Sequence, residues 1–287
     1  MKLLQPTSWE DALAAKAATP DARAIRGGTD LMIELNAGRP RPAAMLDLGR
    51  VPEIAGWAAD DGHVVLGAGV TFTQIVDQLS AQLPALAMAA RTVGSPQIRN
   101  RGTIGGNLGT ASPAGDAHPP LLATDAAVKL ASVRGTRWIG IRELFVGPKH
   151  TSMEADELIE CVRVPRTRGQ QQFAKIGTRN AMVISVCAFA LAIDPQRRRV
   201  GTGIGSAGPV PLAAEEAESF LAGVLTESDA WESGLALSEA TSARFGELVG
   251  AAARPIDDVR GTADYRRHAL AVMARRTLSW TCARPTS

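Results

Sequence analysis

Two glycine pairs in polar turns constrain this chain more than any other feature of its sequence. The first turn is Gly27-Gly28-Thr29-Asp30, and the second is Thr103-Ile104-Gly105-Gly106-Asn107. Glycine pairs let the backbone approach a ligand closely, and successive N–H groups in such turns form an anion-binding nest that suits a pyrophosphate. Each pair can also be a plain turn. Because the two turns lie far apart in the sequence, only folding can bring them into one site.

The second turn belongs to a long polar stretch from Thr92 to Pro120, which is dense in Gly, Pro, Ser, Thr and Asn. We expect a loop here, and a loop of this length inside a compact domain is usually functional. Neither turn has the G-x-G-x-x-G spacing, and Gly105-Gly106 does not lead into a clear helical pattern. A Rossmann nicotinamide site is therefore disfavoured, and the phosphate-loop motif G-x-x-x-x-G-K-[ST] does not occur.

Apolar periodicity and capping motifs predict alternating strands and helices in the first half of the chain. The second half is expected to hold a hairpin followed by helices, and this change places a domain boundary near residue 170. The predicted helices span residues 8–18, 71–83, 212–221, 229–246 and 264–281, and the predicted strands span 43–48, 63–67, 157–164, 173–176, 183–193 and 200–207.

Composition excludes several classes of function. The 287 residues include 31 Lys+Arg and 29 Asp+Glu, and only 4% are aromatic. Nucleic-acid binding normally needs a strongly basic face and stacking aromatics, so we expect none. The N-terminus has no apolar signal region, and no apolar run is long enough to span a membrane. We therefore expect a cytoplasmic protein.

The three cysteines give no sign of a metal site. Cys161, Cys187 and Cys282 form no C-x-x-C pair, whereas an iron–sulfur cluster normally needs about four thiolates. Cys161 and Cys187 lie in apolar, strand-like runs, where buried and inert thiols are expected. We predict neither a metal site nor a catalytic residue in this chain.

Residues 93–116, VGSPQIRNRG-TIGGN-LGT-ASPAGD, resemble the FAD-binding subunit of the molybdenum hydroxylase family. That family includes the medium subunit of carbon monoxide dehydrogenase and the FAD-binding part of xanthine dehydrogenase. Gly27-Gly28-Thr29-Asp30 is similar to the family's N-terminal pyrophosphate loop. Glu157-Leu158-Ile159 before Pro165, and Phe173-Ala174-Lys175 after it, also fit, so the resemblance spans essentially the whole chain.

The resemblance implies an α+β fold. A two-lobed FAD-binding domain of the vanillyl-alcohol-oxidase (PCMH) type would occupy residues 1–170, with lobes of about 1–60 and 61–170. A smaller α+β domain like that of carbon monoxide dehydrogenase flavoproteins would occupy residues 171–287. The cofactor-binding residues implied are Arg26, Gly27, Gly28, Thr29, Asp30, Leu31, Val93, Thr103, Ile104, Gly105, Gly106, Asn107, Asp116, Ile159 and Lys175.

Three of these positions, and the neighbouring His118, raise specific expectations. Arg26 replaces the family's usual alanine, and its cation can pair with a phosphate or point to solvent. The resemblance puts Lys175 close to the flavin and Ile159 near the flavin or adenine end. His118, two residues after Asp116, is expected to be a loop histidine rather than a catalyst. Outside this set, Arg197-Arg198-Arg199 is expected to be a solvated turn or a docking contact.

The function implied is that of an FAD-carrying electron-transfer subunit. It would take electrons from [2Fe–2S] clusters in a small partner subunit and pass them to an external acceptor, while a large partner subunit carries molybdopterin. A dimer of such heterotrimers is the expected assembly. A stand-alone flavin oxidase or reductase, and a non-catalytic nucleotide-binding scaffold, remain open as alternatives. The sequence identifies neither the substrate nor the terminal acceptor.

Overall fold

The protein, seen here as a computed structural model, is described over residues 1–60, 62–167, 169–232 and 237–282. It begins with a small parallel sheet in the order β1-β3-β2. The first helix starts where the sequence predicts, because the Ser8 side chain accepts a hydrogen bond from the N–H of Asp11. The elements of this part are β1 (Lys2–Leu4), α1 (Trp9–Ala18), β2 (Arg23–Ile25), α2 (Leu31–Asn36), β3 (Ala44–Asp47), η1 (Leu48–Arg50) and η2 (Pro52–Ile54).

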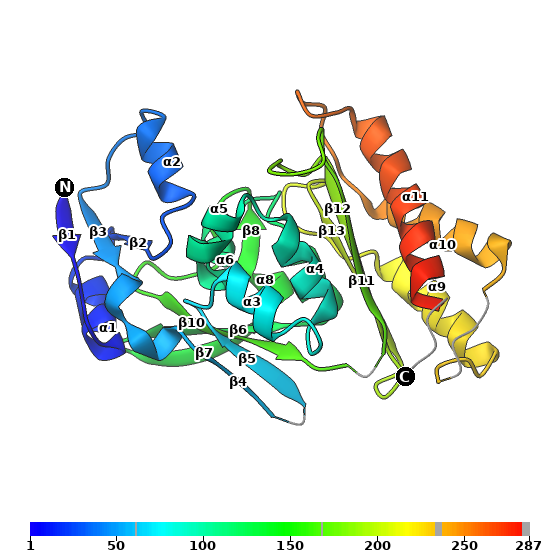
Figure 1. The fold of residues 1–287 in the computed structure, drawn as a ribbon, viewed down its shortest axis with the longest axis horizontal. Helices are drawn as coiled ribbons and strands as arrows, with labels where there is room; N and C mark the ends of the chain where they lie inside the picture. Colours follow the sequence, from blue (N-terminus) through cyan, green and yellow to red (C-terminus); the bar gives the residue numbers. More distant parts are fainter. Residues whose placement is uncertain (61, 168, 233–236, 283–287) are drawn as a thin grey trace.

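A five-stranded antiparallel sheet in the order β4-β5-β10-β6-β7 follows, and helices pack on one face of it (Figure 1). Val64, Leu66, Leu130 and Val162 are fully buried on that face and form one hydrophobic core with the helices. The elements are β4 (Trp57–Ala59), β5 (His63–Gly67), α3 (Phe72–Gln78), α4 (Pro84–Thr92), β6 (Ala127–Ser132), β7 (Gly135–Gly140), α8 (Ile141–Leu144), β8 (Phe145–Gly147), β9 (His150–Thr151) and β10 (Leu158–Pro165).

The segment from Thr92 to Pro120 is not the predicted loop. It contains α5 (Pro96–Arg101), α6 (Ile104–Thr110) and the start of α7 (His118–Ala123). The side chains of Ser95 and Thr103 cap α5 and α6 by accepting N–H hydrogen bonds. These helices have only six or seven residues, and α6 is rich in glycine, so no apolar period was visible. The helix predicted to reach residue 83 also ends early, at Gln78.

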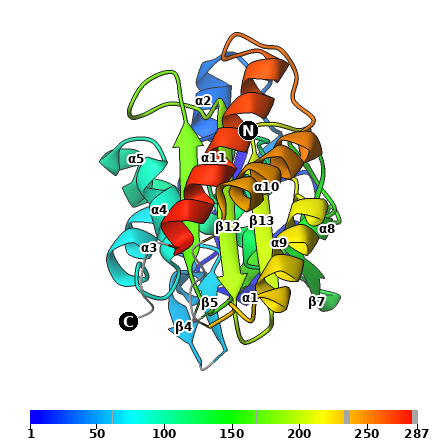
Figure 2. The same cartoon turned by 90° about the vertical axis from the view of Figure 1, so that its right-hand side faces the viewer.

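The C-terminal part is an antiparallel sheet, β11-β12-β13, enclosed between two layers of helices (Figures 1 and 2). Alternate residues of β12 face opposite layers. Cys187, Phe189, Leu191 and Ile193 belong to a core shared with α9–α11, whereas Ala188, Ala190 and Ala192 belong to a core with α4 and α7. The elements are β11 (Gln171–Ile176), β12 (Cys187–Asp194), β13 (Arg199–Gly205), α9 (Glu215–Glu227), α10 (Glu239–Ala252) and α11 (Ala263–Cys282).

Most predicted elements of this part are present, with shifted ends. The hairpin is confirmed, although β12 begins at Cys187 rather than at residue 183. Residues 233–236 of the helix predicted over 229–246 lie outside the described residues, and α10 begins at Glu239. No helix in the described ranges is long and apolar enough to span a membrane.

The prediction of buried, inert thiols is confirmed for the two cysteines with described side chains. Cys161 and Cys187 are 8% and 0% exposed. Burial raises the pKa of Cys161 to about 11 and that of Cys187 to about 12. Both thiols therefore stay protonated near neutral pH and are poor nucleophiles.

Candidate cofactor site

The fold brings the two glycine turns together. A side chain at position 27 would overlap the carbonyl oxygen of Arg101, so only glycine allows this close approach. Arg101 Nη2 donates to the carbonyl oxygen of Arg26 at 3.4 Å, and Thr110 Oγ1 donates to Asp30 Oδ2 at 3.2 Å. The β2–α2 turn therefore lies along α5 and α6.

The first turn has the form of an anion-binding nest. Gly28 adopts a φ of 75°, in the left-handed region that favours glycine. The backbone N–H groups of residues 27–30 donate to no acceptor within the described part of the chain. Adjacent free N–H groups around a left-handed residue can bind a phosphate.

The second turn differs from the expected nest. The N–H groups of Ile104 and Gly105 donate to carbonyl oxygens of segment 68–70, each at 2.9 Å, and the N–H of Gly106 donates to Thr103 Oγ1 at 3.1 Å. These donors are already used, because the turn packs against the end of β5 and caps α6. A ligand can therefore contact this turn only at its solvent-exposed side.

Two glycines and an amide form the open side of α6. Gly106 and Gly109 are both exposed, one helical turn apart. A Cβ at position 106 would have Thr103 Oγ1 at 3.0 Å as its one close neighbour, and a Cβ at position 109 would meet Ile159 Cδ1 at 3.9 Å. Asn107 Oδ1 is buried here and has no hydrogen-bond partner among the described residues. This surface can receive the face of a ligand and offers it one unused acceptor.

An ion pair joins this region to the C-terminal part. Lys175 Nζ on β11 donates to Asp116 Oδ2 at 2.6 Å and to the carbonyl oxygen of Thr92 at 3.3 Å, and Thr92 Oγ1 donates to the same carboxylate oxygen at 3.2 Å. Both charged side chains are 8% exposed. Burial raises the pKa of Asp116, and the ammonium of Lys175 opposes this rise. Asp116 Oδ1 has no partner within the described ranges.

His118 is a buried helix residue rather than the expected loop residue. It begins α7, is 0% exposed and packs against Phe145 in a tilted arrangement, with the ring centroids 4.5 Å apart. Its Nε2 donates to the carbonyl oxygen of Asn107 at 3.3 Å, so α7 supports the helical turn that carries this amide. Burial lowers the pKa of His118 to about 4, and the ring is neutral at pH 7.

The depressed pKa of His118 predicts a loss of stability in acid. The unfolded chain binds a proton near the ordinary pKa of 6.5, whereas the folded chain resists protonation down to about pH 4. This one ring should therefore lower the free energy of unfolding by up to about 3 kcal/mol between these pH values. Urea unfolding of His118→Gln at several pH values should lack this contribution. His268→Gln, at an exposed histidine, is the matched control, and equal pH profiles for both variants would refute the assignment.

The Arg26 side chain neither stays free to pair with a phosphate nor points to solvent, the two orientations expected from the sequence. Its guanidinium donates to the carbonyl oxygens of Leu48 and, at 3.2 Å, Val51. Gly69 leaves the space that the guanidinium fills. Burial and the neighbouring charge of Arg101 lower its pKa. The side chain thus ties β2 to the segment after β3, while its backbone belongs to the first turn.

Two further predicted residues, Val93 and Leu31, lie at the end of α4 and at the start of α2. Val93 ends α4 next to Thr92 and packs against the N-terminal core. Leu31 lines a hollow of about 520 Å³ beside α2. Sequence reasoning missed Thr92 and Thr110, because no local motif marks them. Lys175 lies 83 positions from Thr92, and Asp30 lies 80 positions from Thr110. No group of three or more His, Cys, Asp and Glu in the described part of the chain could hold a metal.

Comparison with known proteins places the chain in a family. Residues 1–167 match the family described as "FAD binding domain in molybdopterin dehydrogenase". The chain belongs to this family. Residues 172–281 match the "CO dehydrogenase flavoprotein C-terminal domain". The resemblance carried by residues 93–116 is thereby confirmed.

Relatives within the molybdopterin dehydrogenase family match nearly the whole chain. The nicotine 6-hydroxylase medium subunit of Paenarthrobacter nicotinovorans is 32% identical, over 97% of this chain and 96% of its own. The xanthine dehydrogenase FAD-binding subunit of Escherichia coli O157:H7 is 30% identical, over 94% and 91%. A chain of the reconstituted CO dehydrogenase from Oligotropha carboxidovorans superposes with a TM-score of 0.88 at 28% identity, over 99% and 98%. The predicted α+β fold, with an FAD-binding domain and a smaller C-terminal domain, is confirmed.

Proposed function

We propose that this chain binds FAD across the β2–α2 turn and the open side of α6. The main support is a set of unsatisfied polar groups around these two elements. Within the described residues, Asn107 Oδ1 and Asp116 Oδ1 are buried acceptors without a hydrogen-bond partner. Within the same residues, the backbone N–H groups of residues 27–30 donate no hydrogen bond. Buried polar groups in native proteins are nearly always hydrogen-bonded. A dinucleotide supplies what is missing, since its diphosphate accepts and its ribose and ring N–H or O–H groups donate.

Each set of residues then has a distinct task. The free N–H groups of the first turn hold the diphosphate, and Thr29 adds a short polar side chain there. Gly106 and Gly109 leave room for the cofactor against α6, with Ile159 beneath it. Asn107 and Asp116 accept hydrogen bonds from the cofactor, and Lys175 fixes the orientation of the Asp116 carboxylate. Val93 packs against the cofactor from the end of α4.

We further propose that the chain is the electron-transfer flavoprotein of a molybdenum hydroxylase complex. Bound FAD accepts electrons singly and can release them as a pair, while the protein supplies binding, orientation and electrostatics. Family membership and the relatives' names support a multi-subunit oxidoreductase. The proposed partners are a small subunit with [2Fe–2S] clusters and a large molybdopterin subunit, in a dimer of heterotrimers.

This proposal is tested with the chain alone and in its complex. The purified chain should bind FAD and show a flavin spectrum that a chemical reductant bleaches reversibly. It should not be reduced by an organic substrate until the partner subunits are added. A chain that binds no FAD would overturn the flavoprotein assignment, and substrate-dependent reduction of the isolated chain would overturn the division of labour. Metal analysis of the native complex should find molybdenum and iron.

A further inference from the structure

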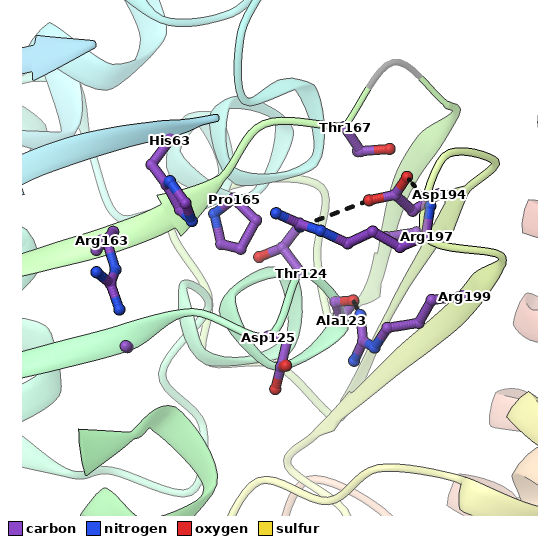
Figure 3. A pocket seen from close by; sticks show the side chains of 12 residues that line it. His63, Ala123, Thr124, Asp125, Arg163, Pro165, Thr167, Asp194, Arg197 and Arg199 are labelled. Carbon is purple, nitrogen blue, oxygen red and sulfur yellow. Dashed lines mark hydrogen bonds and ion pairs between the residues drawn. The ribbon is translucent and has the colours of Figure 1, made fainter. Parts of the chain in front are cut away.

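A pocket lies where the two parts of the chain meet (Figure 3). It encloses about 220 Å³. The N-terminal part contributes the end of β10, the start of β5 and the end of α7, and the C-terminal part contributes β12, β13 and the turn between them. Lys175 pairs with Ala188 near one end of β12, whereas Asp194 is at the other end, about 20 Å away at ~3.3 Å per residue.

Three guanidinium groups line this pocket from three different positions. Arg163 and Arg199 lie on opposite sides, and Arg197 extends between them (Figure 3). The carboxylates of Asp125 and Asp194 also line it, so the charged side chains carry a net charge of about +1 with neutral histidine. The excess positive charge is balanced by an anion that several of these guanidinium groups share.

Most donors of these arginines are not used by the protein. Arg199 Nη1 donates to the carbonyl oxygen of Ala123 at 2.8 Å. The Arg163 guanidinium stacks over the Trp138 ring at 4.5 Å. Arg197 Nη1 lies 3.6 Å from Asp194 Oδ2, too far for a hydrogen bond. Within the described residues, Arg163 and Arg197 donate no side-chain hydrogen bond, and each guanidinium has five N–H donors.

We propose that this pocket binds a small oxyanion, a phosphate or a carboxylate, between the two parts of the chain. Guanidinium forks match the oxygen geometry of both groups and bind them bidentately. Arg163 belongs to the five-stranded sheet, while Arg197 and Arg199 belong to the β12–β13 hairpin. An anion held by all three links the two parts on the edge opposite the Lys175–Asp116 pair. The Arg197-Arg198-Arg199 turn then has a ligand-binding role at its first and third residues.

The test measures binding of two probes to the FAD-loaded chain. Inorganic phosphate and malonate are titrated in separate calorimetry and thermal-unfolding experiments, with sodium chloride of equal ionic strength as the reference. A saturable rise in Tm with either probe, absent with chloride, is expected. The probe that binds more tightly identifies the oxyanion class.

Single-residue variants test whether this pocket is the site at which the probe binds. Arg163→Gln and Arg197→Gln should each raise the Kd of the probe at least about tenfold, because a charged hydrogen-bond donor is lost. Arg198→Gln removes the same charge from the same turn but at a residue that does not line the pocket, and its Kd should match that of the unmodified chain. No saturable Tm shift, or equal weakening by Arg198→Gln, would overturn the proposal. The flavin spectrum should be unchanged throughout, which shows that a change in probe binding does not arise at the FAD site.

Discussion

A Gly106→Val protein is expected to fold normally and to bind FAD about 100-fold more weakly. The valine side chain would project from the open side of α6, where the protein's one close neighbour to a Cβ is Thr103 Oγ1 at 3.0 Å. Valine in a helix costs well under about 1 kcal/mol relative to good helix formers and replaces a poorer glycine. The same side chain would occupy the volume proposed for the cofactor. A 100-fold loss corresponds to about 2.8 kcal/mol of binding free energy.

Fluorescence titration of the apoprotein with FAD measures this loss, and the Tm of the apoprotein measures folding. Gly223→Val is the matched control, because position 223 lies in α9 with open space around a Cβ. It carries the same helical substitution and should keep full FAD affinity. Unchanged affinity in Gly106→Val would remove α6 from the binding site. Gly27→Val is a poorer probe, since it overlaps the Arg101 carbonyl oxygen and should damage the fold as well.

The sequence predicted those elements whose signal is local. Ser8 and Asp11 mark the start of α1, and Thr71 with Gln74 forms a capping box at α3. Both motifs act over three residues and can be recognised without tertiary structure. The helices α5 and α6 were missed because tertiary packing, rather than a periodic apolar face, stabilises them. Buried Ile104 and Leu108 insert into the core from a glycine-rich helix that has no such pattern.

The candidate site likewise contains residues that a local sequence motif predicts and residues whose contacts depend on tertiary packing. Its glycines and Asn107 stand in a recognisable motif, so sequence could point to them. The course of the Arg26 side chain could not be predicted, because its acceptors, Leu48 and Val51, are main-chain carbonyls on another segment. The family resemblance implied that Asp116 and Lys175 contact one cofactor but gave no sign that they pair with each other. That contact joins residues 59 positions apart and depends on how β11 packs against α4.

The pairing of Lys175 with Asp116 predicts a large stability effect. Lys175→Met leaves a carboxyl group buried without its cation, and removal of one partner of a buried ion pair typically costs 3–5 kcal/mol. We expect a loss of about 3 kcal/mol in the free energy of unfolding at neutral pH. Burial raises the pKa of Asp116, and loss of the ammonium raises it further. Since the unfolded carboxyl ionises at lower pH, Lys175→Met should lose stability as the pH rises and regain it in mild acid.

A double-mutant cycle separates the pair from its two members. Asp116→Asn with Lys175→Met leaves no buried charge, so the double variant should be more stable than Lys175→Met alone; equal stability would contradict the coupling.

The flavin reduction potential gives an independent readout. In Lys175→Met the pKa of Asp116 rises further, so proton uptake by this carboxyl group offsets the lost ammonium, and the potential should change little. Asp116→Asn leaves an unbalanced ammonium, which favours the reduced and more negative flavin. Its potential should rise by on the order of 20–45 mV, equivalent to about 1–2 kcal/mol for two electrons. Spectroelectrochemical titration resolves such a shift, and an equal potential in both single variants would place the ion pair away from the flavin.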